Sequence, residues 1–150
     1  MPILIFYLDI LEYYNTERAE SKMDNMNSTS MEFLLKGLDA VWLRQKVISN
    51  NIANSETPGY KRLNVEFEDL IKNLIENNYE DIESLKNAIE SVEPVVTQDS
   101  ASSTRLDGNN VVMDKENIEL ARAQLQYEYL VSSLSSQISR LKYAINGGNS

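Results

Sequence analysis

Apolar residues recur at helical spacing over two long segments of the chain. In residues 31–54 they fall every three or four positions, which places them along one face of a helix. In residues 114–146 they return every seven positions, which is typical of a helix that packs along a partner helix. The apolar positions are Leu34, Leu38, Val41, Trp42, Ile48 and Ile52 in the first segment, and Leu120, Tyr127, Leu130, Leu134, Ile138, Leu141 and Ile145 in the second.

Both apolar faces need to be covered, because an isolated helix of this kind is only marginally stable in water. The intervening chain is long enough to return, so the two helices can pair with each other. The predicted fold is therefore mainly α, with long N- and C-terminal helices paired as an antiparallel coiled coil. Each apolar face is wider than a two-helix contact requires, which implies a further neighbour. That neighbour is either the shorter middle helices or other copies of the chain.

The middle of the chain predicts shorter elements. Apolar spacing indicates one or two short amphipathic helices within residues 66–92. The alternating stretch at 63–67 favours an extended segment, and "NVVM" at 110–113 favours a short strand. The small polar residues at 97–104 are typical of a loop.

A stop signal, "TPGY" at 57–60, follows the first apolar segment. Proline disfavours the α conformation in the residue before it, and Gly59 suits the third position of a type II turn, where φ is positive. The preceding Asn50, Asn51 and Asn54 are unusual, because helix interiors disfavour asparagine. Two interpretations are open for these amides: they belong to a solvated helix end, or they hold partner groups at a fixed place.

The boundaries of four regions follow from these patterns. Residues 1–30 open with a short apolar run and continue into a polar stretch typical of a linker. Asp114 is a good N-cap for the last helix, and Gly147 is a good stop. The predicted organisation is a flexible N-terminal extension over 1–30, a coiled-coil helix over 31–57, a middle region over 58–113 and a second coiled-coil helix over 114–148.

Composition excludes several classes of function. The chain of 150 residues carries 14 cations and 23 anions, and a net charge of −9 disfavours binding to nucleic acid or to anionic lipid. It has no Cys and no His, which removes thiolate and imidazole catalysis and Cys/His zinc sites. Glycine-rich phosphate loops and calcium loops are also missing from the sequence. We therefore expect no enzyme, cofactor, metal or small-molecule substrate.

Targeting signals are weak in this sequence. No apolar run approaches the roughly 20 residues that span a bilayer. The apolar run at residues 3–8 has no basic residue before it and is followed closely by Asp9 and Glu12, unlike a cleaved secretory signal. Export, if it occurs, is therefore expected to use another route.

The stretch "SNNIANSETPGYKR", residues 49–62, closely resembles the N-terminal signature of bacterial flagellar axial proteins, the rod and hook class. In the second half, "DGNNV" at 107–111 and "LKYAINGG" at 141–148 resemble the proximal rod subunits of that class. The residues that carry the N-terminal signature are Asn50, Asn51, Ile52, Ala53, Asn54, Thr57, Pro58, Gly59, Tyr60 and Lys61.

The resemblance implies a structural subunit of the proximal rod in the flagellar basal body, which serves motility. Such a subunit polymerises through its terminal helices, transmits torque and lines the export channel. Its implied partners are other copies of itself, other rod proteins, the basal adaptor protein, the inner-membrane ring and the flagellar type III export apparatus. Its implied location is the periplasmic rod, reached without a cleaved signal peptide.

The resemblance also bears on the asparagines, which would hold backbone or neighbouring-subunit groups where the chain turns outward from the inner layer. Two other functions stay open. One is a different flagellar rod subunit. The other is a cytoplasmic helical adaptor that binds a single partner through the same apolar faces. Export separates the last reading from the first two, because an adaptor stays inside the cell.

Overall fold

The computed structural model describes residues 2–67, 72, 76–77, 81–100, 103 and 105–147, and side chains within α1 only from residue 28 onward. The elements follow in the order α1 (Pro2–Ala53), β1 (Leu63–Glu66), α3 (Ile82–Ser91), β2 (Val95–Gln98) and α4 (Met113–Ile145). Helix therefore dominates, and a small two-stranded sheet lies in the middle of the chain. This confirms the predicted class, mainly α with short strands between long terminal helices.

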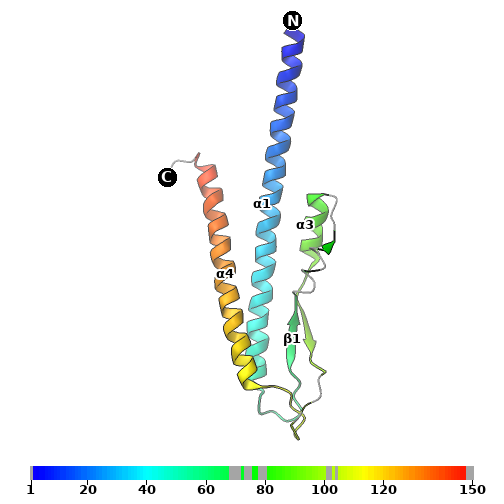
Figure 1. The fold of residues 1–150 in the computed structure, drawn as a ribbon, viewed down its shortest axis with the longest axis vertical. Coiled ribbons are helices and arrows are strands. Elements are labelled where there is room, and N and C mark those ends of the chain that lie inside the picture. Colours follow the sequence, from blue (N-terminus) through cyan, green and yellow to red (C-terminus); the bar gives the residue numbers. More distant parts are fainter. Residues whose placement is uncertain are drawn as a thin grey trace.

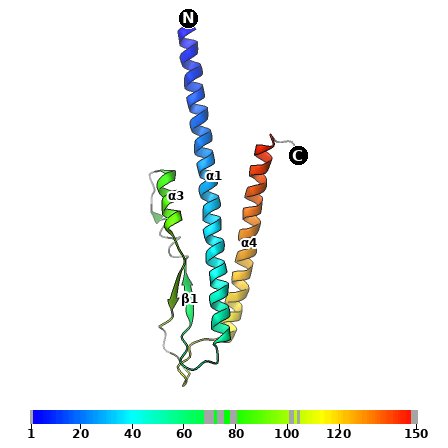
Figure 2. The same ribbon diagram turned by 180° about the vertical axis from the view of Figure 1, so that it is seen from behind.

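The helix α4 runs back along the C-terminal half of α1, and the two helices separate toward the C-terminus of α4 (Figures 1 and 2). In both views α1 lies between α4 and the segment formed by α3, β1 and β2. The opposite direction of the pair follows from its contacts. Gln45 Nε2 donates to the carbonyl of Ala123 at 3.2 Å. Gly37, about two turns before Gln45 on α1, faces Leu130, about two turns after Ala123 on α4, so the two helices run in opposite directions. The coiled-coil geometry predicted for this pair stays a prediction.

A narrow apolar core lies between the two long helices. Val41 and Ile48 of α1 and Ala123 of α4 are buried. Ala123 is the smallest of the three, and a small side chain lets two helix backbones approach closely. Packed against this cluster are the partly buried Ile52, Leu120 and Leu130.

The strands β1 and β2 pair antiparallel, with Leu63 opposite Gln98 and Glu66 opposite Val95. The other edge of β1 faces α1. The side-chain amide of Asn51 donates to the carbonyl of Leu63 at 2.8 Å and accepts from the N–H of the same residue at 2.9 Å. Because a neighbouring strand would make the same pair of bonds, the Asn51 amide takes the place of a strand at this edge. We call β1, β2 and α3 together the arm.

The long first helix differs from its prediction at both ends. It continues back to Pro2 instead of beginning near residue 31, and it ends at Ala53 instead of running to 57. The early end is explained by backbone bonds in the following turns, in which Ser55 N–H reaches the carbonyl of Ile52. Residues 1–30 were predicted to be flexible. The side chains of residues 1–27 are not described, so this flexibility stays a prediction.

The middle region is predicted correctly in part. The extended stretch after the turn is confirmed by β1, and the second amphipathic stripe is confirmed by α3, where Asp81 caps the helix by accepting from Ser84 N–H at 2.6 Å. The first stripe begins at Phe67, which is buried, and the rest of it, up to residue 75, lies almost wholly outside the described residues. The loop predicted at 97–104 was wrong at its start, because Thr97 and Gln98 pair with β1.

Two further predictions near the start of α4 were wrong. Residues 110–113 do not form a strand, since the Asn110 side chain accepts from the N–H of Arg62 at 2.6 Å and α4 already starts at Met113. The N-cap of α4 is Val112, which has no capping side chain, and not Asp114. Just before the helix, the Asn109 side chain accepts from the N–H of Val111 at 2.8 Å.

Candidate functional site

The turn after α1 has the geometry that its sequence requires. Gly59 has φ of 73°, and Tyr60 N–H donates to the carbonyl of Thr57 at 3.2 Å, which closes a four-residue turn. A Cβ at Gly59 would meet nothing within 4 Å, so the backbone conformation alone demands glycine here. Gly59 N–H also donates to the carbonyl of Asp107 at 2.8 Å, which ties this turn to a distant part of the chain.

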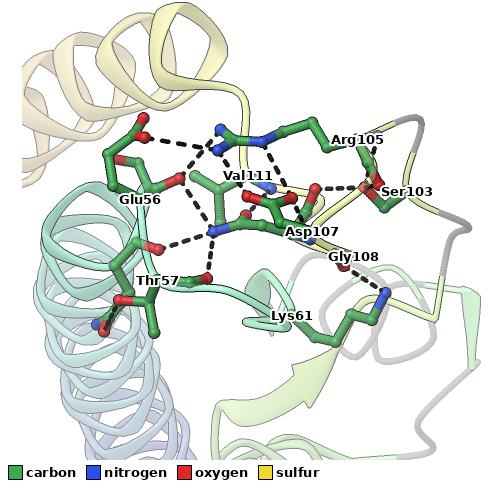
Figure 3. Close-up of polar contacts among 11 residues, drawn as sticks. Glu56, Thr57, Lys61, Ser103, Arg105, Asp107, Gly108 and Val111 are labelled. Atoms are coloured by element: carbon green, nitrogen blue, oxygen red, sulfur yellow. Dashed lines mark hydrogen bonds and ion pairs between the residues drawn. The ribbon is translucent and has the colours of Figure 1, made fainter.

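A second turn, over residues 105–108, lies against the first (Figure 3). Gly108 N–H donates to the carbonyl of Arg105 at 3.1 Å, and Gly108 has φ of 78°. The Arg105 guanidinium binds the Asp107 carboxylate at 2.8 Å and lowers the pKa of that carboxyl. Lys61 Nζ donates to the carbonyl of Gly108 at 2.9 Å. The two turns, which come from the two halves of the chain, are therefore joined by several polar contacts.

Asn109 holds the end of α1. Its side chain is fully buried, and Nδ2 donates toward the carbonyls of Asn54 at 2.9 Å, Ser55 at 3.0 Å and Thr57 at 2.9 Å. Its Oδ1 accepts from Val111 N–H at 2.8 Å. Carbonyls at the end of a helix lack partners within the helix. One side chain from the second half of the chain therefore satisfies the backbone where α1 stops.

Asn51 occupies the centre of the junction and is fully buried. Beyond its two bonds to the backbone of Leu63, its Nδ2 donates to Glu116 Oε2 at 2.9 Å and its Oδ1 accepts from the Tyr60 hydroxyl at 3.2 Å. Both hydrogens and both lone pairs of the amide are thus used. This geometry belongs to an internal structural group and not to a solvated helix end.

Glu116 brings a charge into this buried place. Its side chain is fully buried in the first turn of α4, and Oε1 accepts from Arg62 Nε at 2.6 Å, while the Arg62 side chain is 24% exposed. A buried carboxylate is costly unless it is paired and hydrogen-bonded, and this one has a donor on each oxygen. Burial, and then the charge of Glu116, raises the pKa of the Tyr60 hydroxyl. We call Asn51, Tyr60, Arg62, Asn109 and Glu116 the junction.

The other residues of the predicted signature lie around the junction. Asn54 is half-buried, and its side chain bridges the carbonyl of Asn50 and the hydroxyl of Thr57. The Asn50 side chain is exposed, as are Ala53 and Pro58. The three asparagines that looked alike in sequence therefore have three different surroundings, and only Asn51 is central.

Sequence reasoning missed Asn109, Arg62 and Glu116 as members of this site. Signals for two of them were present, in the "DGNN" stretch after the second turn and in an acidic residue in the first turn of α4. Neither signal indicates which groups the side chain binds, because those groups lie about 50 residues or more away along the sequence. Within the described part of the chain, every buried side-chain nitrogen or oxygen has a hydrogen-bond partner.

The residues predicted as an assembly surface differ widely in exposure. Val41 and Ile48 are buried in the core between α1 and α4, whereas Trp42 is 59% exposed and Ile145 is 82% exposed. Tyr127 is also exposed. The remaining residues of the set are half-buried: Leu34, Leu38, Ile52, Leu120, Leu130, Leu134, Ile138 and Leu141.

Two classes of site find no support in the described residues. They contain no group of three or more acidic side chains placed to hold a metal ion. None of their helices is long and apolar enough to cross a membrane. The class that the described residues define is instead a pair of long terminal helices joined by a buried polar junction, with large apolar side chains exposed along both helices.

The comparison with known proteins agrees with this class. The family model "Flagella basal body rod protein" matches residues 31–61, which form the end of α1 and its turn. The flagellar basal body rod protein FlgB of Bacillus subtilis (strain 168) is 34% identical over 128 residues, which cover 81% of this chain and 96% of the relative. FlgB of Escherichia coli (strain K12) is 28% identical over 131 residues, which cover 80% of this chain and 95% of the relative. The chain belongs to the FlgB family of flagellar basal-body rod proteins.

Proposed function

We propose that this rod component is a subunit of the proximal rod, that it polymerises through its terminal helices, and that it there transmits torque and lines the export channel. The observation that carries the proposal is the set of large apolar side chains left exposed along both terminal helices. On α1 these include Leu35 and Trp42, and on α4 they include Leu125, Tyr129 and Ile145.

Exposed apolar side chains on helices of this length favour a further helical partner. Large contiguous apolar patches are rare on monomeric soluble proteins and mark interaction sites. The antiparallel coiled coil proposed for α1 and α4 covers only one side of each helix, and the arm packs on another side of α1. Other copies and other rod proteins are the proposed partners for the faces that stay exposed. A contact between unlike faces builds either a closed ring or an open helical polymer, and the second is the form that a rod requires.

The basal adaptor protein, the inner-membrane ring and the type III export apparatus are proposed as further partners. The proposed route to the periplasmic rod is this export apparatus, without a cleaved signal peptide. The signature residues 50–61 are proposed to serve this assembly by fixing where the chain leaves the helix pair. The division of the chain into an N-terminal extension, two terminal helices and a middle region belongs to the same proposal.

The substitution Gly59→Val tests the role of the turn. A β-branched residue is strongly disfavoured at φ of 73°, so the turn that joins α1 to the arm should not form. We expect rods to be missing from isolated basal bodies, while the exported chain is still detected outside the cytoplasm. Gly59→Asn is the matched control, since asparagine tolerates positive φ, and it should retain rods.

Two results would count against this proposal. Normal motility in the Gly59→Val strain would show that the turn is not needed for assembly. Retention of the unaltered chain in the cytoplasm would favour a helical adaptor instead of a rod subunit. Deleting the coding sequence provides the reference, because basal bodies without this chain should lack a rod.

A further inference from the structure

Three parts of the molecule meet at the Glu116 carboxylate. Glu116 belongs to α4, Asn51 belongs to α1, and Arg62 directly precedes β1 in the arm. One carboxylate oxygen accepts from Asn51 and the other accepts from Arg62, at 2.9 Å and 2.6 Å. A single buried side chain thus connects both terminal helices with the start of the arm.

We propose that Glu116 is a positioning residue that couples the placement of the arm to the pairing of α1 with α4. The arm also contacts α1 directly, through Asn51 and Leu63, and these contacts fix it in a single place only when α4 is docked and presents this carboxylate. The consequence for assembly rests on the proposed function: in a rod subunit, pairing of the terminal helices would place the arm at the same time.

The chemistry of the three partners explains why a carboxylate is required. Arg62 Nε is a donor, and it can only donate. Asn51 also presents a donor to Glu116, and its amide cannot turn over, because its oxygen already accepts from Leu63 N–H and from the Tyr60 hydroxyl. Both partners therefore present N–H groups, and only a side chain with two acceptor oxygens satisfies both. Glutamine at this position would place its own NH₂ against one of the two donors.

The same contacts explain why arm and helices should respond together. Without α4, Arg62 loses its buried ion-pair partner and the Asn51 Nδ2 group loses one acceptor. If the arm leaves its place and takes the adjoining Arg62 with it, the buried carboxylate loses its only charged partner among the described residues. A buried polar network is favourable when complete and costly when partly broken, so partial states are disfavoured.

Distances between two spin labels on the full chain provide the test. The sequence contains no cysteine, so labels can be attached at only two chosen sites. Val96→Cys places one on the exposed face of β2, and Ser136→Cys places the other on an exposed position of α4. Pulsed electron–electron double resonance then measures the distribution of distances between the two labels, one on the arm and one on α4. Circular dichroism measures helix content in the same samples.

Glu116→Gln is the variant, and Glu119→Gln is the matched control. Glu119 lies one turn further along α4, and its carboxylate pairs with Arg122 of the same helix at 2.7 Å. We expect the control to keep the narrow distance distribution of the parent chain. Glu116→Gln should lose the narrow distribution while its helix content stays at the parent level.

The second variant keeps the test decisive if Glu116→Gln loses helix content. Arg62→Met retains the apolar stem of the side chain and removes the donor, so it should also lose the narrow distribution with its helices intact. A narrow distribution in Glu116→Gln would overturn the proposal. Parallel loss of helix content and arm order in both variants would also overturn it, because Glu116 would then serve overall stability alone. These measurements use the isolated chain, so their outcome is independent of whether the rod assays succeed.

Discussion

The junction and the helix faces beyond it use their side chains in opposite ways. At the junction, Asn51, Asn109 and Glu116 are fully buried, and each polar atom of their side chains has a partner from the same chain. Further along the same helices, Trp42 and Tyr129 are large apolar side chains that are 59% and 72% exposed. The polar groups of the junction all have partners within the chain, whereas the apolar side chains of the helix faces are only partly covered by the chain.

This difference separates two roles that the sequence places close together. A network whose hydrogen bonds are all made within one chain needs no neighbour, so it can set the shape of a subunit before any contact with others. An apolar face that is half covered can become fully buried only against another surface. The most distinctive residues of the sequence thus serve shape, and we infer that assembly depends on less distinctive apolar positions.

The largest effect on folding is expected at Asn51. Asn51→Leu removes an amide that makes four hydrogen bonds to Leu63, Glu116 and Tyr60, and it leaves their buried polar groups without a partner. At 1–3 kcal/mol for an unsatisfied buried group, the free energy of unfolding should fall by about 4 kcal/mol. Urea denaturation followed by circular dichroism measures this change.

The neighbouring asparagine provides the control for that experiment. The Asn50 side chain is exposed, so Asn50→Leu should change the free energy of unfolding by less than about 0.5 kcal/mol. Equal losses in the two variants would mean that the junction does not distinguish these amides. The distinction between a junction of buried polar groups and the exposed helix surface would then not be supported.

The second effect contrasts two apolar residues of α1. Ile48 is buried in the core, and Ile48→Ala should lower the free energy of unfolding by about 3 kcal/mol, as large-to-small core changes do. Trp42 is 59% exposed, and the Lys46 ammonium lies 5.6 Å from the centre of its ring, so Trp42→Ala should cost less than about 1 kcal/mol. In cells, Trp42→Ala should nevertheless reduce the number of basal bodies with rods.

The stability of Trp42→Ala decides how the cellular result is read. If the purified variant unfolds as easily as Ile48→Ala, then Trp42 belongs to the core and its exposed face carries no separate role. Rods in normal number, with stability unchanged, would show that this part of the helix face is not used in assembly.

Much of the fold follows from local signals. Apolar spacing is a property of each segment alone, so the region of the first helix and the extent of the last one could be predicted. The Pro58–Gly59 turn is local as well, because the two residues restrict φ without outside help. Residues 2–30 joined α1 although their polar sequence is typical of a linker, which shows that a long helix can continue where the pattern alone predicts a stop.

The junction could not be predicted in the same way. The donors of Asn109 reach carbonyls more than 50 residues earlier, and nothing in the sequence near Asn109 identifies those carbonyls. The sequence also does not indicate which apolar residues of α4 are exposed. Tyr127 and Leu130 lie on the same predicted stripe, yet Tyr127 is exposed and Leu130 packs on the core, because helix pairing covers one side of the stripe only.

The smallest expected effect is a dependence on alkaline pH at the junction. Burial and the Glu116 charge raise the pKa of the Tyr60 hydroxyl above its ordinary value of 10.0. The unfolded chain therefore loses this proton first as the pH rises, so the contribution of Tyr60 to stability is full below pH 10 and declines as the pH climbs toward the raised pKa.

Tyr60→Phe isolates this contribution from the other groups that titrate in the same range. The variant loses the hydrogen bond to Asn51, so at pH 8 it should be less stable than the parent by about 1 kcal/mol. Above pH 10 the difference between parent and variant should shrink, because only the parent has this proton to lose. Urea denaturation of both chains from pH 8 to pH 11 measures the difference. A constant difference across this range would place the Tyr60 hydroxyl in contact with water, and the junction would be less closed than its hydrogen bonds indicate.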